Sequence, residues 1–224
     1  MKYFLESDGI SINFINTACR NILMPIKAII FDLNGIFIQG PLFGARFSKE
    51  YHVPKEHVLN ILFESMDVVR KQNAPSIYSI WKPHLEEWKV NLSEEEFLQY
   101  WFSAEYENHE MVDYARQLKK EGYTLYILSN NFKERTTYYE KKFSFLKELF
   151  DDIYYSWETG VVKPEKECFM QILDEQHLKP EDCFYVDDSE KNITVAKSLG
   201  ISAELFKGKE TITYALYNHK SQSF

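Results

Sequence analysis

The chain has 224 residues, of which 45% are hydrophobic and 27% are charged, and its formal net charge is −8. This length suits one large domain or a core domain with a smaller insertion, and the composition is ordinary for a soluble globular protein. The negative charge argues against nucleic acid or an anionic membrane as a partner, because both need a basic surface. No apolar stretch approaches the roughly 20 residues of a membrane-spanning helix.

The N-terminal residues and the cysteines bear on the cellular compartment of the protein. Residues 1–23 lack the basic start and clean apolar stretch of a signal peptide, and Met24-Pro25 leads directly into an apolar run. We expect residues 1–23 to be a peripheral N-terminal extension. The three cysteines show no metal-ligand or redox spacing, which favours buried thiols in a reducing cytosol; they are Cys19, Cys168 and Cys183. The predicted location is therefore cytoplasmic.

The predicted elements begin with one strand and a long helical insertion. Lys27–Phe31 is a short apolar run rich in Ile, as expected of a buried strand. Residues 41–108 differ in composition from the rest of the chain, because they are rich in Trp and contain several helix-like segments. Within them, 54–65 has a helical apolar face and a Pro at its start. The segment 93–102 opens with Ser93 and has a Glu three residues later, which predicts a capping box.

After this insertion, helices and strands alternate. Helices are expected over 109–121, 132–148, from Pro164 to about 177, over 189–199, and at the C-terminus; strands are expected over 123–129, 151–156, 183–188 and 201–206. Strands and helices in this order predict a parallel sheet wrapped by helices. We therefore expect an α/β fold with a doubly wound parallel sheet. Its core would comprise 24–40 and 109–224, and a small helical domain (41–108) would be inserted after the first strand.

Three of the predicted strands end in clusters of polar residues. These clusters are Asp32-Leu33-Asn34-Gly35, Ser129-Asn130-Asn131 and Asp187-Asp188, and a fourth feature is Lys163 in the loop before a helix. A loop Lys is usually solvated, and an Asp pair at a strand end often caps a helix. Active sites of parallel sheets, however, lie beyond the carboxyl ends of the strands. All four features on that edge together predict a functional site.

The residue types in these clusters favour phosphoryl chemistry. The Asp32 carboxylate can attack phosphorus and form an aspartyl-phosphate. With Asp187 and Asp188 it offers the hard oxygen ligands that suit Mg²⁺, which neutralises the charge between carboxylate and phosphate. The Ser129 hydroxyl and the Lys163 ammonium can bind phosphate oxygens.

The four clusters resemble the motifs of the haloacid dehalogenase (HAD) superfamily. They are DLNGI, LSNN, VVKPE and VDDSEKN, and the resemblance runs from about residue 26 to 207. It implies a Rossmannoid α/β core, and the insertion is similar to a small helical cap of the C1 type. It further implies a Mg²⁺-dependent hydrolase that acts on a small-molecule phosphate ester.

The resemblance also implies a role for each site residue. Asp32 would be the nucleophile, and the Asn34 backbone carbonyl would join Asp32, Asp187 and Asp188 as metal ligands. Phosphate would be bound by a second set of residues, Ser129, Asn130 and Lys163. Asn192, one turn into the next helix, either supports the loop or is a plain surface residue.

This sequence departs from the family pattern at Asn34, where phosphatases of the superfamily carry a second Asp. That Asp protonates the leaving group and then activates water, and such general acid/base catalysis contributes ~10²–10⁴-fold. Three interpretations stay open. In the first, the chain is a phosphatase that is slow or that acts on esters with good leaving groups. In the second, it is a phosphate-binding protein with impaired catalysis, and in the third it is an enzyme that acts on substrates other than phosphates. The third class includes dehalogenases, which also lack the second Asp, and phosphonate hydrolases, which use a cap Lys.

Overall fold

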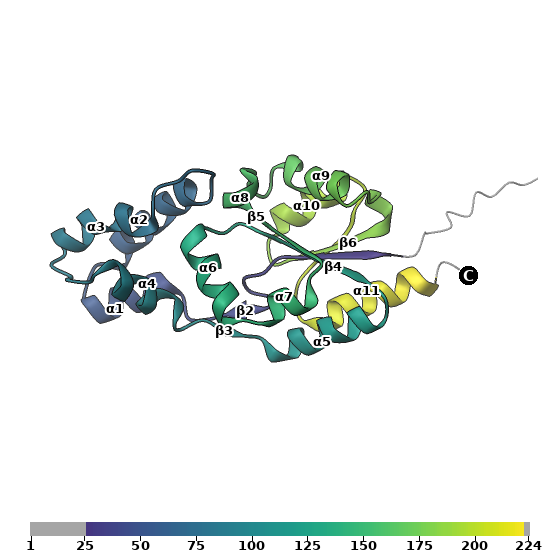
Figure 1. Ribbon diagram of the computed structural model, residues 1–224, viewed down its shortest axis with the longest axis horizontal. Coiled ribbons are helices and arrows are strands. Elements are labelled where there is room, and N and C mark those ends of the chain that lie inside the picture. The colour runs from purple at the N-terminus through teal and green to yellow at the C-terminus, as the bar shows by residue number, and fades with distance from the viewer. Residues whose placement is uncertain (1–25, 222–224) are drawn as a thin grey trace, which may run out of the picture.

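The computed structural model describes residues 26–221 (Figure 1). Its centre is a five-stranded parallel sheet in the order β5-β4-β1-β6-β7. The strands are β1 (Ala28–Phe31), β4 (Thr124–Ser129), β5 (Asp152–Tyr155), β6 (Cys183–Asp187) and β7 (Ser202–Leu205). The chain moves outward from β1 to β5 and then crosses back to β6 and β7, so the predicted doubly wound α/β sheet is confirmed. The expected extension (1–23) and Cys19 lie outside the described residues.

Helices cover both faces of this sheet. One face is packed by α5 (His109–Lys120), α7 (Phe145–Leu149) and α11 (Lys209–Ser221), and the other by α9 (Lys166–Glu175) and α10 (Glu190–Ser198). Successive side chains of a strand point to opposite faces. In β1, Ile29 and Phe31 join the first core, whereas Ala28 and Ile30 join the second. Burial on both sides explains why this strand is a continuous apolar run.

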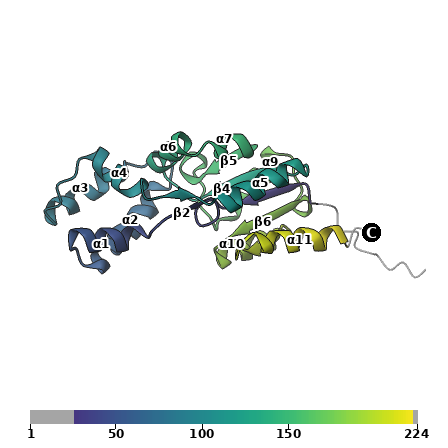
Figure 2. The same cartoon turned by 90° about the horizontal axis from the view of Figure 1, so that it is seen from below.

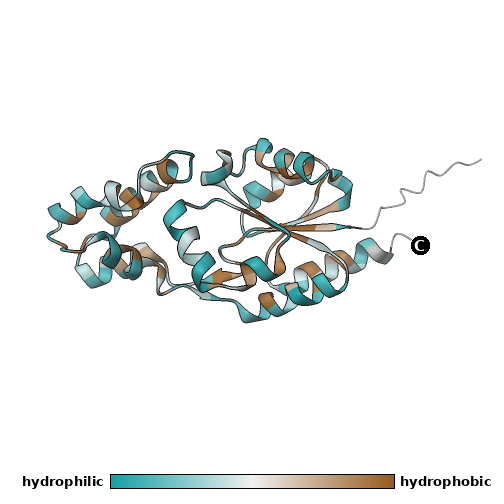
Figure 3. Cartoon of the chain, viewed as in Figure 1, coloured by the Kyte–Doolittle hydropathy of each residue, from teal (hydrophilic) through white to brown (hydrophobic). Residues whose placement is uncertain are grey.

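The segment after β1 forms a separate layer of four helices, called the insert below (43–102). These helices are α1 (Phe43–Tyr51), α2 (Lys55–Val69), α3 (Ile77–Glu87) and α4 (Glu94–Phe102). Figure 2 shows them at one end of the molecule, beyond α6 (Lys133–Lys142). The insert has its own aromatic core, in which the Phe43 and Trp101 rings stack 3.9 Å apart and Trp81 is fully buried. Hydrophobic segments in Figure 3 accordingly form two groups, one in the sheet and one in the insert.

Two short strands join the insert to the sheet. The chain leaves through β2 (Ile38–Gln39) and returns through β3 (Tyr106–Glu107), and the two pair antiparallel. The Asn108 side chain, directly after β3, donates a hydrogen bond of 3.0 Å to the Ile36 carbonyl. The two connections to the insert are therefore held together.

Two sequence expectations about helices are wrong. The helix expected over 132–148 is two helices, α6 and α7, separated at Phe143 and Ser144. Because of this break, Phe143 and Phe145 of α7 both enter the same core. In one straight helix, residues two positions apart would point to opposite sides. The helix expected to begin at Pro164 begins at Lys166, because the residues before it form a loop rather than a first turn. A further short helix, α8 (Ser156–Thr159), and the 3₁₀ turn Pro180–Asp182 were not anticipated.

Candidate active site

The carboxyl ends of β1, β4 and β6 meet at one edge of the sheet. Phe31, the last residue of β1, pairs with Ile127 on one side and Val186 on the other. The next residue, Asp32, donates its backbone N–H to the Val186 carbonyl at 2.9 Å. This register places Asp32 beside Asp187, so the polar clusters that follow the three strands lie together.

Lys163 lies at the centre of this edge, with its side chain almost fully buried. Its ammonium nitrogen, Nζ, donates to Asp32 Oδ1 at 2.8 Å and to Asp187 Oδ2 at 2.6 Å. The Lys163 backbone is fixed by the Asn130 side chain. Asn130 Oδ1 accepts from the Lys163 N–H at 2.8 Å, and Asn130 Nδ2 donates to the Lys163 carbonyl at 2.9 Å. Asn130 thus positions Lys163, and its predicted phosphate contact stays a prediction.

Asp187 is fully buried and accepts hydrogen bonds from several donors. Besides Lys163, they are the Tyr185 hydroxyl, the Asn192 side-chain amide at 2.9 Å and the Ser189 backbone N–H at 2.8 Å. Burial raises the pKa of Asp187, but the Lys163 charge and the donors outweigh burial and hold that pKa below its ordinary value. Asn192 is therefore a buried partner of the site and not a surface residue.

Three carboxylates surround this single ammonium. Oxygen atoms of Asp32, Asp187 and Asp188 all lie within 4.8 Å of one another. Burial, with the nearby Asp187 charge adding to it, raises the pKa of Asp32 to about 6 despite the opposing effect of Lys163. Burial and Asp187 likewise raise the pKa of Asp188. A compact group of oxygen ligands with surplus negative charge has the chemistry that suits a hard divalent cation such as Mg²⁺.

The loop after β1 approaches the carboxylates closely. Gly35 has a φ of +88°, and a Cβ at this position would lie 2.6 Å from Asp188 Oδ2. Any side chain would be strained by this backbone conformation and would also displace Asp188. A glycine at position 35 therefore gives the Asp188 carboxylate its place beside the loop.

Ser129 is buried at the end of β4, and its hydroxyl oxygen has no hydrogen-bond partner among the described residues. Buried hydroxyls are normally paired, and an unpaired one costs about 1–3 kcal/mol. A ligand at this edge of the sheet would supply the missing partner.

The Asn34 side chain is held by Tyr139 and Asn131, neither of which was given a role in the predicted site. Its amide nitrogen donates to the Tyr139 hydroxyl at 2.8 Å, and its oxygen accepts from Asn131 Nδ2 at 3.0 Å. Asn131 belongs to the predicted cluster Ser129-Asn130-Asn131, so its place at this edge of the sheet was expected although its contact with Asn34 was not. Tyr139 lies within α6, and no signal in the sequence pointed to it.

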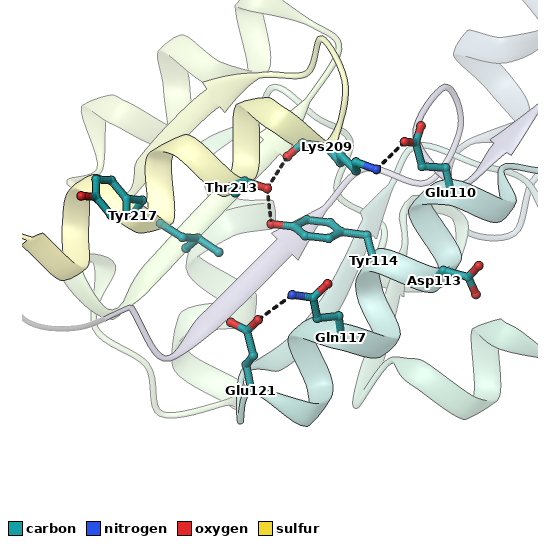
Figure 4. Close-up of a pocket in the computed structure, with 9 residues that line it drawn as sticks. Glu110, Asp113, Tyr114, Gln117, Glu121, Lys209, Thr213 and Tyr217 are labelled. Atoms are coloured by element: carbon teal, nitrogen blue, oxygen red, sulfur yellow. Dashed lines mark hydrogen bonds and ion pairs between the residues drawn. The ribbon is translucent and has the colours of Figure 1, made fainter.

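A different cavity lies between α5 and α11 (Figure 4) and has a volume of about 610 Å³. Polar pairs line it, including Lys209 with Glu110 at 2.6 Å and the Tyr114 hydroxyl with Thr213 Oγ1 at 2.9 Å. None of the residues at the strand ends lines this cavity. It therefore has no direct part in the site described above.

Within residues 26–221, the helices are all too short or too polar to cross a membrane.

Comparison with known proteins identifies the relatives of this chain. The family model of the haloacid dehalogenase-like hydrolases matches residues 26–200. Bifunctional epoxide hydrolase 2 of Rattus norvegicus is 24% identical over 198 residues, which cover 80% of this chain and 36% of that protein. The chain thus spans little more than a third of that relative. D-ribitol-5-phosphate phosphatase of Bacteroides thetaiotaomicron is 30% identical over 94 residues, or 40% of this chain and 45% of that enzyme.

Solved structures show the same fold. A HAD family enzyme of Bacteroides thetaiotaomicron superposes with a TM-score of 0.73 at 23% identity, covering 86% of this chain and 98% of that one. The same enzyme in complex with magnesium and inorganic phosphate superposes with a TM-score of 0.68. At this level of identity the likeness establishes the fold alone.

Proposed function

The chain belongs to the haloacid dehalogenase-like hydrolases, and from this premise we propose that it is a Mg²⁺-dependent phosphatase that acts on a small phosphate ester. The observation that carries the proposal is the convergence of Asp32, Lys163 and the Asp187-Asp188 pair at one edge of the sheet. The similarity of part of the chain to a sugar-alcohol phosphatase supports phosphate esters as the substrate class. We also assign residues 41–108 as a C1-type cap and 24–40 with 109–224 as the core.

The side chains of Asp32, Asp187 and Asp188, with the Asn34 backbone carbonyl, would hold the metal. Bound Mg²⁺ neutralises charge on the phosphate oxygens, so that an anionic nucleophile can approach. Lys163 contributes a second positive charge beside Asp32, 2.8 Å from its carboxylate oxygen. The unpaired Ser129 hydroxyl is the donor for a phosphate oxygen.

Asp32 then carries the covalent step. A carboxylate oxygen of Asp32 attacks phosphorus, the bond from phosphorus to the leaving oxygen breaks, and the leaving oxygen departs with the electron pair. This forms an aspartyl-phosphate on Asp32. Water subsequently attacks the phosphorus, which releases inorganic phosphate and regenerates the carboxylate. Asn130 keeps Lys163 in position through both steps by its two bonds to the Lys163 backbone.

Asn34 determines which leaving groups can depart. Its amide cannot donate and recover a proton near neutral pH, and both ends of the amide are engaged with Tyr139 and Asn131. An alkyl ester, whose alkoxide needs a proton, should therefore react slowly. An aryl or acyl phosphate, whose leaving group is stable as an anion, should react faster. The protein is thus expected to favour activated phosphates.

The test compares hydrolysis of an aryl and an alkyl phosphate by the wild-type chain, Asn34→Asp and Asp32→Ala, with and without Mg²⁺. Asn131 Nδ2 can donate to a carboxylate at position 34 as it does to the amide, and the Tyr139 hydroxyl is within reach as a second donor. We therefore expect Asn34→Asp to fold normally and to raise kcat for the alkyl ester by ~10²-fold or more. The gain for the aryl ester should be smaller.

The same experiment separates the alternatives. Asp32→Ala should abolish all turnover, and wild-type turnover should require Mg²⁺. Absence of turnover in both wild type and Asn34→Asp, together with tight phosphate binding, would replace the phosphatase with a phosphate-binding protein. Release of halide from a haloacid without metal would identify a dehalogenase instead.

A further inference from the structure

The C-terminal end of α2 brings part of the insert against the core. The Gln72 side chain donates a hydrogen bond to the Glu158 carbonyl, which belongs to α8 of the core. A Cβ at Gly160, just after α8, would lie only 3.1 Å from the Gln72 side chain. These contacts place the end of α2 on the core, and Arg70 lies two residues before Gln72.

Arg70 is a partly buried arginine without a hydrogen-bond or ion-pair partner among residues 26–221. Its Nε atom is buried without a hydrogen bond, and within the described part of the chain no ion pair or hydrogen bond involves its side chain. The other partly buried arginines have acceptors. Arg135 pairs with Glu105, and Arg46, whose Nε is likewise unpaired, donates from a terminal nitrogen to two backbone carbonyls. A buried guanidinium nitrogen without an acceptor is costly, and Arg70, unlike Arg46 and Arg135, has no acceptor among the described residues, so a ligand is the candidate acceptor.

The charges around Arg70 indicate that it lies within electrostatic reach of the nucleophile. Burial lowers its pKa, the like charge of Arg135 lowers it further, and the carboxylates of Asp32 and Asp67 oppose both effects. Arg70 and Asp32 therefore interact through space, but they form no direct ion pair, unlike Lys163 and Asp32 at 2.8 Å. A positive group of the insert thus acts on the core nucleophile without touching it.

We propose that Arg70 binds an oxyanion of the substrate that is bound at Asp32. The proposal rests on the proposed function, because it places the substrate at Asp32. Two parts of a substrate could supply the oxyanion. They are the phosphoryl group that is transferred, or a second acidic group on a phosphorylated acid. In both cases the guanidinium offers paired donors that match the geometry of an oxyanion.

The test measures binding of three probes by calorimetry in the presence of Mg²⁺. The probes are inorganic phosphate, ethylphosphonate and 3-phosphonopropionate, of which the last two are phosphonates that differ in a carboxylate. The variants are Arg70→Gln, Arg70→Lys and the matched control Lys71→Gln, which removes the same charge from the adjacent, exposed residue. Lys71→Gln should leave every affinity within about twofold of wild type.

Arg70→Gln should weaken binding of at least one probe by ~10-fold or more, as expected for loss of a hydrogen bond to a charged group. Weakening of all three probes would identify the transferred phosphoryl group as the ligand, and weakening of 3-phosphonopropionate alone would identify a second acidic group. Arg70→Lys should recover part of the loss, which a purely structural role for Arg70 would not explain. Affinities within twofold of wild type for all three probes in Arg70→Gln would overturn the proposal.

These measurements do not depend on hydrolysis. If Arg70 determines probe affinity but no ester is hydrolysed, the anion site stands and the proposed phosphatase activity fails. If esters are hydrolysed but substitution of Arg70 does not change the affinity for any probe, the proposed activity stands and the proposed anion site fails. Thermal unfolding of Arg70→Gln, which removes an unpaired charge, should occur at or above the wild-type temperature.

Discussion

Asp32 lies among groups of both signs, and its surroundings disfavour its charge. Lys163 attracts the carboxylate from 2.8 Å, but burial and the Asp187 carboxylate outweigh that attraction. The pKa of Asp32 is consequently raised from an ordinary value of 3.8 to about 6. When folding raises the pKa of a carboxyl group, ionisation of that group destabilises the folded state. The destabilisation is complete at a pH above the pKa in the folded state and nearly absent at a pH below the pKa in the unfolded state.

Asp32→Asn should therefore stabilise the metal-free protein at pH 7.5. The variant keeps an acceptor for Lys163 but removes the buried charge, and the shift in pKa corresponds to a gain of at most about 3 kcal/mol in the free energy of unfolding. The gain should shrink to roughly half at pH 5, because wild-type Asp32 is then largely protonated in the folded state. Urea denaturation in EDTA at both pH values measures it.

Mg²⁺ provides the control for this prediction. A divalent cation compensates the surplus charge, so saturating Mg²⁺ should stabilise the wild-type chain more than Asp32→Asn and narrow the difference between them. A variant that is less stable than wild type at pH 7.5, or a gain that is the same at both pH values, would contradict the electrostatic account.

Among single residues, those that directly follow a strand were easier to predict from the sequence than those whose side chains hold them in position. Asp32, Ser129 and Asp187 could be expected at one edge because parallel strands end there, and the register of β1, β4 and β6 brings them together. The contact between Asn34 and Tyr139 could not be expected, because it joins residues 105 positions apart and α6 shows no polar pattern that marks Tyr139. Side-chain packing decides such contacts, and packing is not visible in one sequence.

Among the elements, α4 begins where a local sequence motif, the capping box, predicts a helix start. The Ser93 hydroxyl accepts from the Glu96 backbone N–H, and the Glu96 side chain accepts from the Ser93 N–H at 2.8 Å, which confirms the predicted capping box. Ser93→Ala removes the hydroxyl and leaves an N–H of the first turn without its acceptor. We expect the melting temperature to fall by about 2–4 °C.

Calorimetry or circular dichroism can measure this change, with Glu94→Gln as the control. Glu94 lies in the same first turn but takes no part in the capping box, so its substitution should lower the melting temperature by less than half as much. Equal effects of the two substitutions would show that first-turn charge, and not the capping hydrogen bonds, stabilises α4.

Other element boundaries were set by contacts between distant parts of the chain. No turn residue marks the end of α6 at Phe143, where the ring enters the core beside Phe145. Pro164 suggested the first turn of a helix, but Asn130 holds the backbone of Lys163 in a loop and delays α9 to Lys166. Local propensity thus predicted the strands of the parallel sheet and most of the long helices, whereas tertiary contacts fixed where these elements begin and end.

For the molecule as a whole, a buried ion pair ties the insert to the core. Glu105, in the connection that returns from α4, pairs with Arg135 of α6, and both side chains are largely buried. Lys142 of the same helix donates to the Glu105 backbone carbonyl at 2.6 Å. The Arg135 guanidinium also lies 5.3 Å from the centre of the Tyr139 ring, whose hydroxyl holds Asn34. The connection to the insert and the loop after β1 therefore share one network.

Glu105→Gln should weaken the whole molecule, because it leaves the Arg135 guanidinium in a largely buried position without a carboxylate. Removing one partner of a buried pair typically costs about 3 kcal/mol, and urea denaturation measures the loss. The control is Asp113→Asn, whose partner Arg116 and own side chain are well exposed, so that its loss should cost less than about 1 kcal/mol. Glu105→Leu combined with Arg135→Met should recover most of the stability, since replacing both partners of a buried pair by apolar side chains leaves no unpaired charge. Equal losses for Glu105→Gln and the double variant would instead show that the shape of the pair, and not its charge, joins the insert to the core.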